Sequence, residues 1–393
     1  MKSVSRIKLA VSLLAVLVVT LMVLASPAHA AKLAGTSVKI GILVPFTGFL
    51  ADQGWLQKYA LEVAQEEINA AGGIGGVPVE LPMYDTQTKP EEAINLVRKV
   101  ATSDKALAII GPFTSTECEM AFPVANRFKI VAISASSAAP GIAAKNRPWA
   151  FRVSLPSDKS LEPTVRKWKE MYGIKTAAVI YDASEALFKA EGTIIFPKLL
   201  KDNGIQVVDS VTFVKADIDY SAQVTRIKAA NPDGLVLATS YNAGANITRQ
   251  ARQQGFTKPI VGSTANMAPD YIRIAGASGE GTIAVAGAWE DNPDPRVQNF
   301  IKKFLVKSKG KRLDNSAWYV YDVIYMLKQV IESSGVTNKP EDLDADRAKI
   351  RDAFAKMKDY PGVSGKISVR ADGDSDKEIY VVQVKDGKWV VVR

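Results

Sequence analysis

The chain of 393 residues contains one cysteine, Cys118, and one histidine, His29. A single cysteine cannot form an intrachain disulfide. His29 lies in a segment that we expect to be removed, so the mature chain would lack a Ser-His or Cys-His pair and the commonest zinc ligand. The sequence also has no Gly-x-Ser-x-Gly motif and no metal-ligand cluster. We therefore expect a protein that is not an enzyme and that uses no cofactor.

Long apolar runs are also scarce, and the one present, Leu9–Leu24, lies at the N-terminus. Lys2, Arg6 and Lys8 precede the run, and Ala28-His29-Ala30 follows it. This order predicts a signal peptide, residues 1–30, cleaved after Ala30, and a periplasmic mature chain. A single membrane anchor is the alternative, but the run is short for a span of about 20 residues. Cleavage removes three basic residues and lowers the formal net charge from +9 to +6, which gives no reason to expect a nucleic-acid partner.

Two neighbouring segments between Ala106 and Pro140 carry the strongest pattern. The apolar runs Ala106–Ile110 and Ile130–Ile133 indicate buried strands of a parallel sheet. Small hydroxyl residues follow each run: Thr114, Ser115 and Thr116, then Ser134, Ser136 and Ser137. Ligands of open α/β sheets bind beyond the carboxyl ends of strands, where helices beginning near Ser115 and Pro140 would present free N–H groups. The pattern predicts a site for a carboxylate or another oxyanion, with ordinary helix caps as the alternative.

Strands and helices alternate through most of the chain. Before these two segments we expect strands at Val38–Val44 and Val77–Tyr84, and helices at Trp55–Ala71 and Glu91–Thr102. A passage from Pro148 to Pro156 separates this half from the next. The expected elements of the second half are helices Leu161–Tyr172, Phe188–Asn203, Tyr220–Ala230 and Gly244–Gln254 and strands Thr176–Tyr181, Ile205–Phe213, Gly234–Thr239 and Pro259–Gly262. The order predicts an α/β fold of two doubly wound parallel-sheet lobes with a ligand cleft between them.

The last part of the chain mixes helices with predicted hairpins. We expect a strand at Ile283–Trp289 and helices at Pro295–Lys307, Ser316–Ser333 and Arg347–Met357. Lys366–Val369 and Ile379–Val392 are predicted to pair around Asp372-Gly373-Asp374, and a second hairpin turns at Lys385–Lys388. The Asp372–Asp376 run lacks the last glutamate of a calcium loop, so we expect an exposed turn there.

Eight segments carry a family resemblance: VKIGILVPFTGFLADQG, AQEEINAAGGIGG, IIGPFTST, ISASSAAPG, VIYDASEALFKAEG, ITRQARQQGF, IAGASGEGTIA and AWYVYDVIY. In this order they resemble type I extracytoplasmic solute-binding proteins of the leucine/isoleucine/valine-binding family, which deliver ligand to ABC importers. The resemblance implies a monomer with an ABC permease partner in the inner membrane. It also implies three hinge crossings, near Val153, Ala284 and Pro361. Residues 31–153 and 285–361 would then form lobe 1, residues 154–284 lobe 2, and residues 362–393 a C-terminal segment of lobe 2 or the hinge.

The resemblance also implies site residues. Ser115 would bind a ligand carboxylate through its hydroxyl and N–H, with Thr114 and Phe113 beside it. Ser136, Ser137 and Ala138 match the loop for the carboxylate and the ammonium. Tyr241 matches a wall residue of the second lobe, and Gln53 and Trp55 lie where the family often has an aromatic lid.

Two positions depart from the family pattern. Ala138 stands where amino-acid binders often have threonine, and Thr264 stands where they have an acid that holds the α-ammonium. An ammonium without a carboxylate would be poorly compensated in a closed cleft. Either Asp182 or Glu185 substitutes for the acid, or the ligand is an aromatic or aliphatic acid, or an amide. Aromatic residues near the site would suit an apolar ligand, although some could belong to the lobe cores: Phe113, Trp55, Phe188 and Tyr241.

The leading hypothesis is a transport binding protein for an amino acid, branched-chain first, or a related small carboxylate. A ligand-sensing module for a membrane receptor would use the same cleft, and the sequence hardly separates the two. A secreted enzyme with Ser115 as nucleophile and a distant Lys or Glu as base is the third alternative.

Overall fold

The computed structural model describes residues 32–392. The predicted signal peptide and its cleavage site therefore lie outside the described residues. Among the helices within this range, none is both long enough and apolar enough to cross a membrane.

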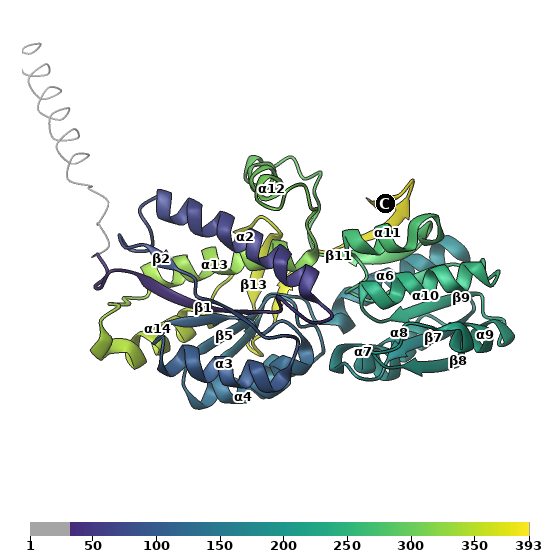
Figure 1. Ribbon diagram of the computed structural model, residues 1–393, viewed down its shortest axis with the longest axis horizontal. Helices are drawn as coiled ribbons and strands as arrows, with labels where there is room; N and C mark the ends of the chain where they lie inside the picture. The colour runs from purple at the N-terminus through teal and green to yellow at the C-terminus, as the bar shows by residue number, and fades with distance from the viewer. Residues whose placement is uncertain (1–31, 393) are drawn as a thin grey trace, which may run out of the picture.

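The first lobe is built on a parallel sheet, at the left of Figure 1. Its strands follow the order β2-β1-β4-β5-β6, and β3 also pairs with β1. The strands are β1 (Val38–Val44), β2 (Val79–Glu80), β3 (Met83–Asp85), β4 (Ala108–Ile110), β5 (Val131–Ser134) and β6 (Ala150–Arg152). β1 has its predicted bounds, whereas the predicted strand Val77–Tyr84 is divided into β2 and β3. β6 was not predicted, because it has only three residues within the proline-bounded passage.

Helices cover both faces of this sheet. Successive side chains of a strand point to opposite faces, so Ile42 and Val44 pack against α2 and α13 while Leu43 packs against α3 and α4. The helices of this lobe are α2 (Ala51–Ala70), α3 (Pro90–Thr102), α4 (Ser115–Arg127), α5 (Ile142–Lys145), α12 (Pro295–Lys307), α13 (Asn315–Ser333), the short 3-10 helix η3 (Pro340–Asp342) and α14 (Leu343–Ala355).

The second lobe has a sheet of order β16-β15-β11-β10-β9-β7-β8, at the right of Figure 1. β7 to β11 are parallel, and β15 and β16 add an antiparallel edge. The strands are β7 (Thr176–Asp182), β8 (Gln206–Phe213), β9 (Gly234–Ala238), β10 (Ile260–Gly262), β11 (Ile283–Ala286), β15 (Tyr380–Lys385) and β16 (Lys388–Val391). The hairpin at Lys385–Lys388 is confirmed.

The helices of the second lobe again lie on two faces, with α6 and α8 packed on one face and α9 and α10 on the other. They are α6 (Ser157–Tyr172), α7 (Ala186–Ala190), the π-helical turn η1 (Glu191–Ile195), α8 (Phe196–Asp202), α9 (Ser221–Ala229), α10 (Tyr241–Gln253), α11 (Pro269–Ala275) and the 3-10 turn η2 (Gly276–Gly279). The predicted helix Phe188–Asn203 is therefore one helical stretch that changes its winding at η1.

The predicted hairpin around Asp372-Gly373-Asp374 forms from its predicted first strand, but its second strand is not Ile379–Val392. β13 (Gly365–Val369) pairs with β14 (Ser375–Lys377) and β12 (Tyr360–Gly362), while β15 pairs with β11 in the other lobe. The small sheet of β12, β13 and β14 packs into the first-lobe core through Val363, Ile367 and Val369. The chain thus passes to the second lobe between β14 and β15, later than the position expected near Pro361. The other two passages follow β6 and β11.

The turn before β14 is not fully exposed, contrary to expectation. Asp374 is buried and accepts a hydrogen bond from Arg152 at 2.6 Å. Arg152 is itself completely buried, at the end of β6. A buried guanidinium requires a counter-charge, and Asp374 supplies it from a segment more than 200 residues away.

Candidate functional site

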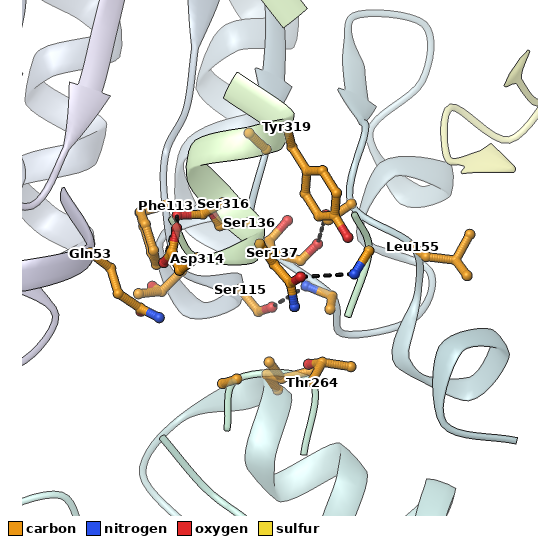
Figure 2. A pocket seen from close by; sticks show the side chains of 18 of the residues that line it. Gln53, Phe113, Ser115, Ser136, Ser137, Leu155, Thr264, Asp314, Ser316 and Tyr319 are labelled. Carbon is orange, nitrogen blue, oxygen red and sulfur yellow. Dashed lines mark hydrogen bonds between the residues drawn. The ribbon is translucent and has the colours of Figure 1, made fainter. Parts of the chain in front are cut away.

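A cavity of about 90 Å³ lies between the two lobes. A cavity that holds a single water has about 10–15 Å³ of such space, so this cavity has room for a small organic molecule. Figure 2 shows the labelled serines of the first lobe on one side of the cavity and Thr264 of the second lobe on the other. The predicted site residues that line it are Gln53, Phe113, Thr114, Ser115, Ser136, Ser137, Ala138, Glu185 and Thr264.

Ser115 is the first residue of α4, and residues 111–114 connect it to the end of β4. Thr114 is the N-cap of this helix, and its hydroxyl accepts the N–H of Glu117 at 3.1 Å. Glu117 completes a capping box by accepting the Thr114 N–H at 2.7 Å. Thr114 thus has the ordinary capping role as well as a place on the cavity wall. The cap fixes the first turn of α4 and with it the position of Ser115.

The hydroxyl of Ser115 joins the two predicted strand-end loops. Ser115 Oγ accepts the N–H groups of Ala138 and Ala139, each at 3.2 Å. A hydroxyl that accepts two hydrogen bonds still has its own proton to donate. Ser115 can therefore donate to a carboxylate in the cavity while it holds the second loop in place.

The second loop is fixed from several sides. Ser134 donates to the Pro112 carbonyl at 2.8 Å and accepts the Ser137 N–H at 3.1 Å. Arg152 donates to the Ala139 carbonyl at 2.5 Å. Gln57 of α2, which the sequence did not single out, donates to the Ser136 hydroxyl at 2.6 Å. The Ser136 proton therefore remains available to a ligand.

Two carboxyl groups line the same cavity. Glu185 accepts the N–H of Thr116 at 3.2 Å and its hydroxyl at 2.6 Å, and burial raises the pKa of Glu185 to about 7. Asp314 is the N-cap of α13, where it accepts the Ala317 N–H at 2.8 Å, and burial raises its pKa to about 6. Either group can carry negative charge near neutral pH and compensate a ligand ammonium.

Apolar side chains from both lobes meet around the cavity. Phe113 of the first lobe packs into a core of the second, and Leu187 and Phe188 of the second pack into a core of the first. All three line the cavity. Phe188 thus belongs to an apolar core and also borders the cavity. The lobes are in contact, so a ligand in the cavity would be largely removed from water.

Three predicted residues do not line the cavity. Trp55 is 38% exposed, packs against Phe46 and Tyr59, and donates to the Phe46 carbonyl at 3.2 Å. Tyr241 is buried in a second-lobe core and its hydroxyl donates to Asp52 at 3.4 Å. Asp182 accepts the Ser184 N–H at 2.8 Å, so it closes its own turn.

Several lining residues were missed by the sequence analysis. Asp314, Asn315, Ser316 and Tyr319 all come from the beginning of α13. The one signal was Asp314, two residues before the predicted helix Ser316–Ser333, which is typical of an N-cap and not specific to a site. Asn315 also spans the lobes, because it donates to the Val285 carbonyl at 3.2 Å and accepts the Gly287 N–H at 2.8 Å.

Cys118 lies close to the site but is not part of it. It is completely buried in α4, and its thiol donates to the Pro112 carbonyl at 3.4 Å. Burial raises the pKa of the thiol to about 12. The thiol therefore stays protonated at neutral pH, as expected for a small buried helix residue rather than for a reactive cysteine.

Comparison with known proteins identifies relatives of similar length. The chain is 27% identical over 323 residues to a leucine-, isoleucine-, valine-, threonine- and alanine-binding protein of Pseudomonas aeruginosa, covering 81% of this chain and 84% of the relative. A Leu/Ile/Val-binding protein homolog of Brucella melitensis is 23% identical, covering 92% and 95%.

Solved structures show the same fold. The leucine-binding protein LivK of Thermotoga maritima matches with a TM-score of 0.80 and 26% identity, covering 91% of this chain and 98% of that one. A solute-binding protein of Rhodopseudomonas palustris in complex with benzoate matches with a TM-score of 0.80 and 22% identity, covering 91% and 95%. The model of the family described as periplasmic binding protein matches residues 37–388, nearly the whole described chain. By this match and by its fold, the chain belongs to the periplasmic binding protein family.

Proposed function

We propose that the protein is the substrate-binding component of an ABC importer and closes its two lobes on a small carboxylate, in the first place a branched-chain or other amino acid. The observation that carries the proposal is the placement of Ser115 and the Ser136–Ala138 loop in one cavity with Glu185 and Asp314. Hydroxyl and N–H donors suit a carboxylate, and the two acids suit an ammonium. The names of the Pseudomonas and Thermotoga relatives point to the same ligand class.

The location and the partner belong to the same proposal. Residues 1–30 have the order of a signal peptide, and the family is periplasmic by its description. We infer that the mature chain works in the periplasm as a monomer and passes its ligand to a permease in the inner membrane. Co-purification of a membrane receptor in place of a permease would instead favour the sensing alternative.

A second candidate ligand is an aromatic or aliphatic acid without an amino group. Phe113 and Phe188 offer apolar surface in the cavity, and Thr264 provides no charge of its own. The benzoate complex of Rhodopseudomonas palustris indicates that the fold can accommodate such a ligand.

A thermal-shift panel on the mature protein, stripped of ligand, separates the two candidates. It compares leucine, isoleucine, valine and phenylalanine with their deaminated acids, with benzoate-type acids and with simple amides. A ligand that binds only the folded form raises the melting temperature by mass action. Shifts with the amino acids support the first candidate, and shifts with the acids alone support the second. No shift with any compound would contradict the proposal.

A further inference from the structure

One buried carboxyl group next to the cavity has no part in the site described so far. Glu191 begins the π-helical turn η1 and is completely buried. Its Oε1 lies 3.4 Å from the Thr264 hydroxyl, and its Oε2 has no hydrogen-bond partner among residues 32–392. The turn packs closely on β7, because a Cβ on Gly192 would lie 2.3 Å from the ring of Tyr181. Such π-helical turns within helices frequently occur at functional sites.

Thr264 connects this carboxyl group to the cavity. Its side chain lines the cavity on the second-lobe side, facing the serines of the first lobe (Figure 2). Glu191 has acceptor oxygens, so the Thr264 hydroxyl donates its proton to Glu191 and presents its lone pairs as acceptors elsewhere. A donor group on a ligand, such as an ammonium, fits that acceptor.

We propose that Glu191 is a specificity-determining residue that acts through the Thr264 hydroxyl and favours ligands with an amino group over the same acids without one. The inference rests on the proposed function, since it assumes a carboxylate ligand in the cavity. Glu191 would then be the acid that compensates the ligand ammonium. It lies behind Thr264, the uncharged residue that stands where amino-acid binders have an acid.

The surroundings of Glu191 make its charge responsive to a ligand. Burial raises its pKa to about 8, and the neighbouring hydroxyls of Ser157, Ser263 and Thr264 oppose that shift. None of the largest influences on this pKa is a charged side chain. A nearby ammonium favours the ionised form of a carboxyl, so binding an amine-bearing ligand should release a proton from Glu191. A ligand without the amine has no such effect.

Proton release from Glu191 has to be distinguished from proton release by other titratable groups nearby. On α6, α7, α8 and β7, which pack against η1, the buried ones are Asp182 and Glu185, and the half-buried ones are Asp158, Lys167 and Tyr181. The remaining charged residues of these elements are exposed. Glu185 and Asp314 in the cavity have pKa values of about 7 and about 6, so both are mostly ionised at pH 8 before ligand binds. Of these three acids, Glu191 is the one that still carries a substantial share of its proton at that pH.

Isothermal titration calorimetry at pH 8 tests the proposal. Leucine and 4-methylpentanoate, which is leucine without the amine, are titrated in two buffers of different ionisation enthalpy. We expect leucine to release roughly half a proton from the wild-type protein and 4-methylpentanoate to release none. Glu191→Gln should abolish the release and reduce the preference for leucine about tenfold. Thr264→Val keeps Glu191 and the side-chain shape but removes the connecting hydroxyl, so it should reduce the preference for leucine similarly. This second variant tests the proposal if Glu191→Gln fails to fold.

Asp322→Asn serves as the matched control, because Asp322 is also a buried acid but lies in the first lobe, bound to Val363 and Ser364. It should change neither the proton release nor the preference. An unchanged preference and proton release in Glu191→Gln would overturn the inference and leave the proposed function intact. If the wild-type protein binds 4-methylpentanoate but does not bind leucine, that result also overturns the inference, in favour of the second ligand candidate. Binding of neither compound would contradict the first candidate function and the inference together.

Discussion

Thr116 and Glu185 form a hydrogen-bonded pair between the two lobes. The Thr116 hydroxyl donates to Glu185 at 2.6 Å, its N–H donates to the same carboxyl at 3.2 Å, and the Ala186 N–H donates back to the Thr116 hydroxyl at 3.0 Å. Thr116 lies in the first turn of α4, and Glu185 is the N-cap of α7. Since the partners belong to different lobes, the pair can form only when the lobes are together. It should therefore contribute to the closed state and not to the stability of either lobe.

Thr116→Val should weaken the binding of every ligand class by about 1–2 kcal/mol, because the closed state loses a hydrogen bond to a charged group. Calorimetry gives the affinity, and small-angle scattering gives the radius of gyration of the ligand-free and saturated protein. Thr225→Val, an exposed threonine of α9, is the control and should bind as the wild type does. A loss confined to one ligand class would contradict a general role in closure and indicate direct recognition.

Ser115→Ala should weaken carboxylate binding by about 1–3 kcal/mol, because the ligand loses a hydroxyl donor and the Ala138 and Ala139 N–H groups lose their acceptor. The affinity is measured by calorimetry and the fold by the melting temperature without ligand. Ser210→Ala, an exposed serine of β8, controls for the substitution itself. If Ser115→Ala binds with unchanged affinity, the strand-end serines do not form the carboxylate site.

The sequence was most informative where local pattern and burial agree. The apolar run Val38–Val44 is a strand with those bounds, and the hydroxyl clusters after β4 and β5 do come together through Ser115. It was least informative where distant segments decide the structure. Asp314 and Tyr319 reach the cavity from α13, about 200 residues after Ser115, and no local signal reports that proximity. Likewise Asp374 looked like part of an exposed turn, since its partner Arg152 is fixed only by the tertiary fold.

The aromatic residues show the same limit. Trp55 and Tyr241 were assigned to the site by family resemblance, yet their rings pack beside it. Ring position depends on side-chain packing between helices, which a matched sequence position does not determine. The acids differ for a similar reason: Asp182 is the last residue of β7 and Glu185 comes three residues later, but only Glu185 lines the cavity.

The stability of the protein should depend on pH through Glu191. Its pKa is raised from 4.5 to about 8, so between these pH values the folded state retains a proton that the unfolded state has lost. Stability from this group therefore falls as pH rises from about 5 to about 8, on the order of 1 kcal/mol per pH unit at most, and is constant above that range. Glu191→Gln removes this dependence, so its free energy of unfolding relative to the wild type should rise with pH. Urea unfolding of both proteins at pH 5, 6, 7 and 8 measures the difference.

If the free energies of unfolding of Glu191→Gln and the wild type change with pH in parallel, Glu191 does not keep its proton in the folded state. Glu119→Gln, at an exposed position, is the control and should change in parallel with the wild type in any case.

The buried pair of Arg152 and Asp374 should be needed for both stability and ligand binding. Asp374→Ala leaves the completely buried Arg152 without its counter-charge, which typically costs about 3–5 kcal/mol of stability. Arg152 also donates to the Ser137 and Ala139 carbonyls, so its displacement should loosen the loop that faces Ser115 and weaken binding in addition. Urea unfolding and calorimetry measure the two effects separately.

The double variant Arg152→Met/Asp374→Leu removes both charges and should recover much of the stability, since apolar replacement of a buried ion pair is often neutral or stabilising. It should not recover the affinity, because methionine cannot donate to the loop carbonyls. Recovery of both would mean that the charge balance alone is needed and that Arg152 does not position the loop.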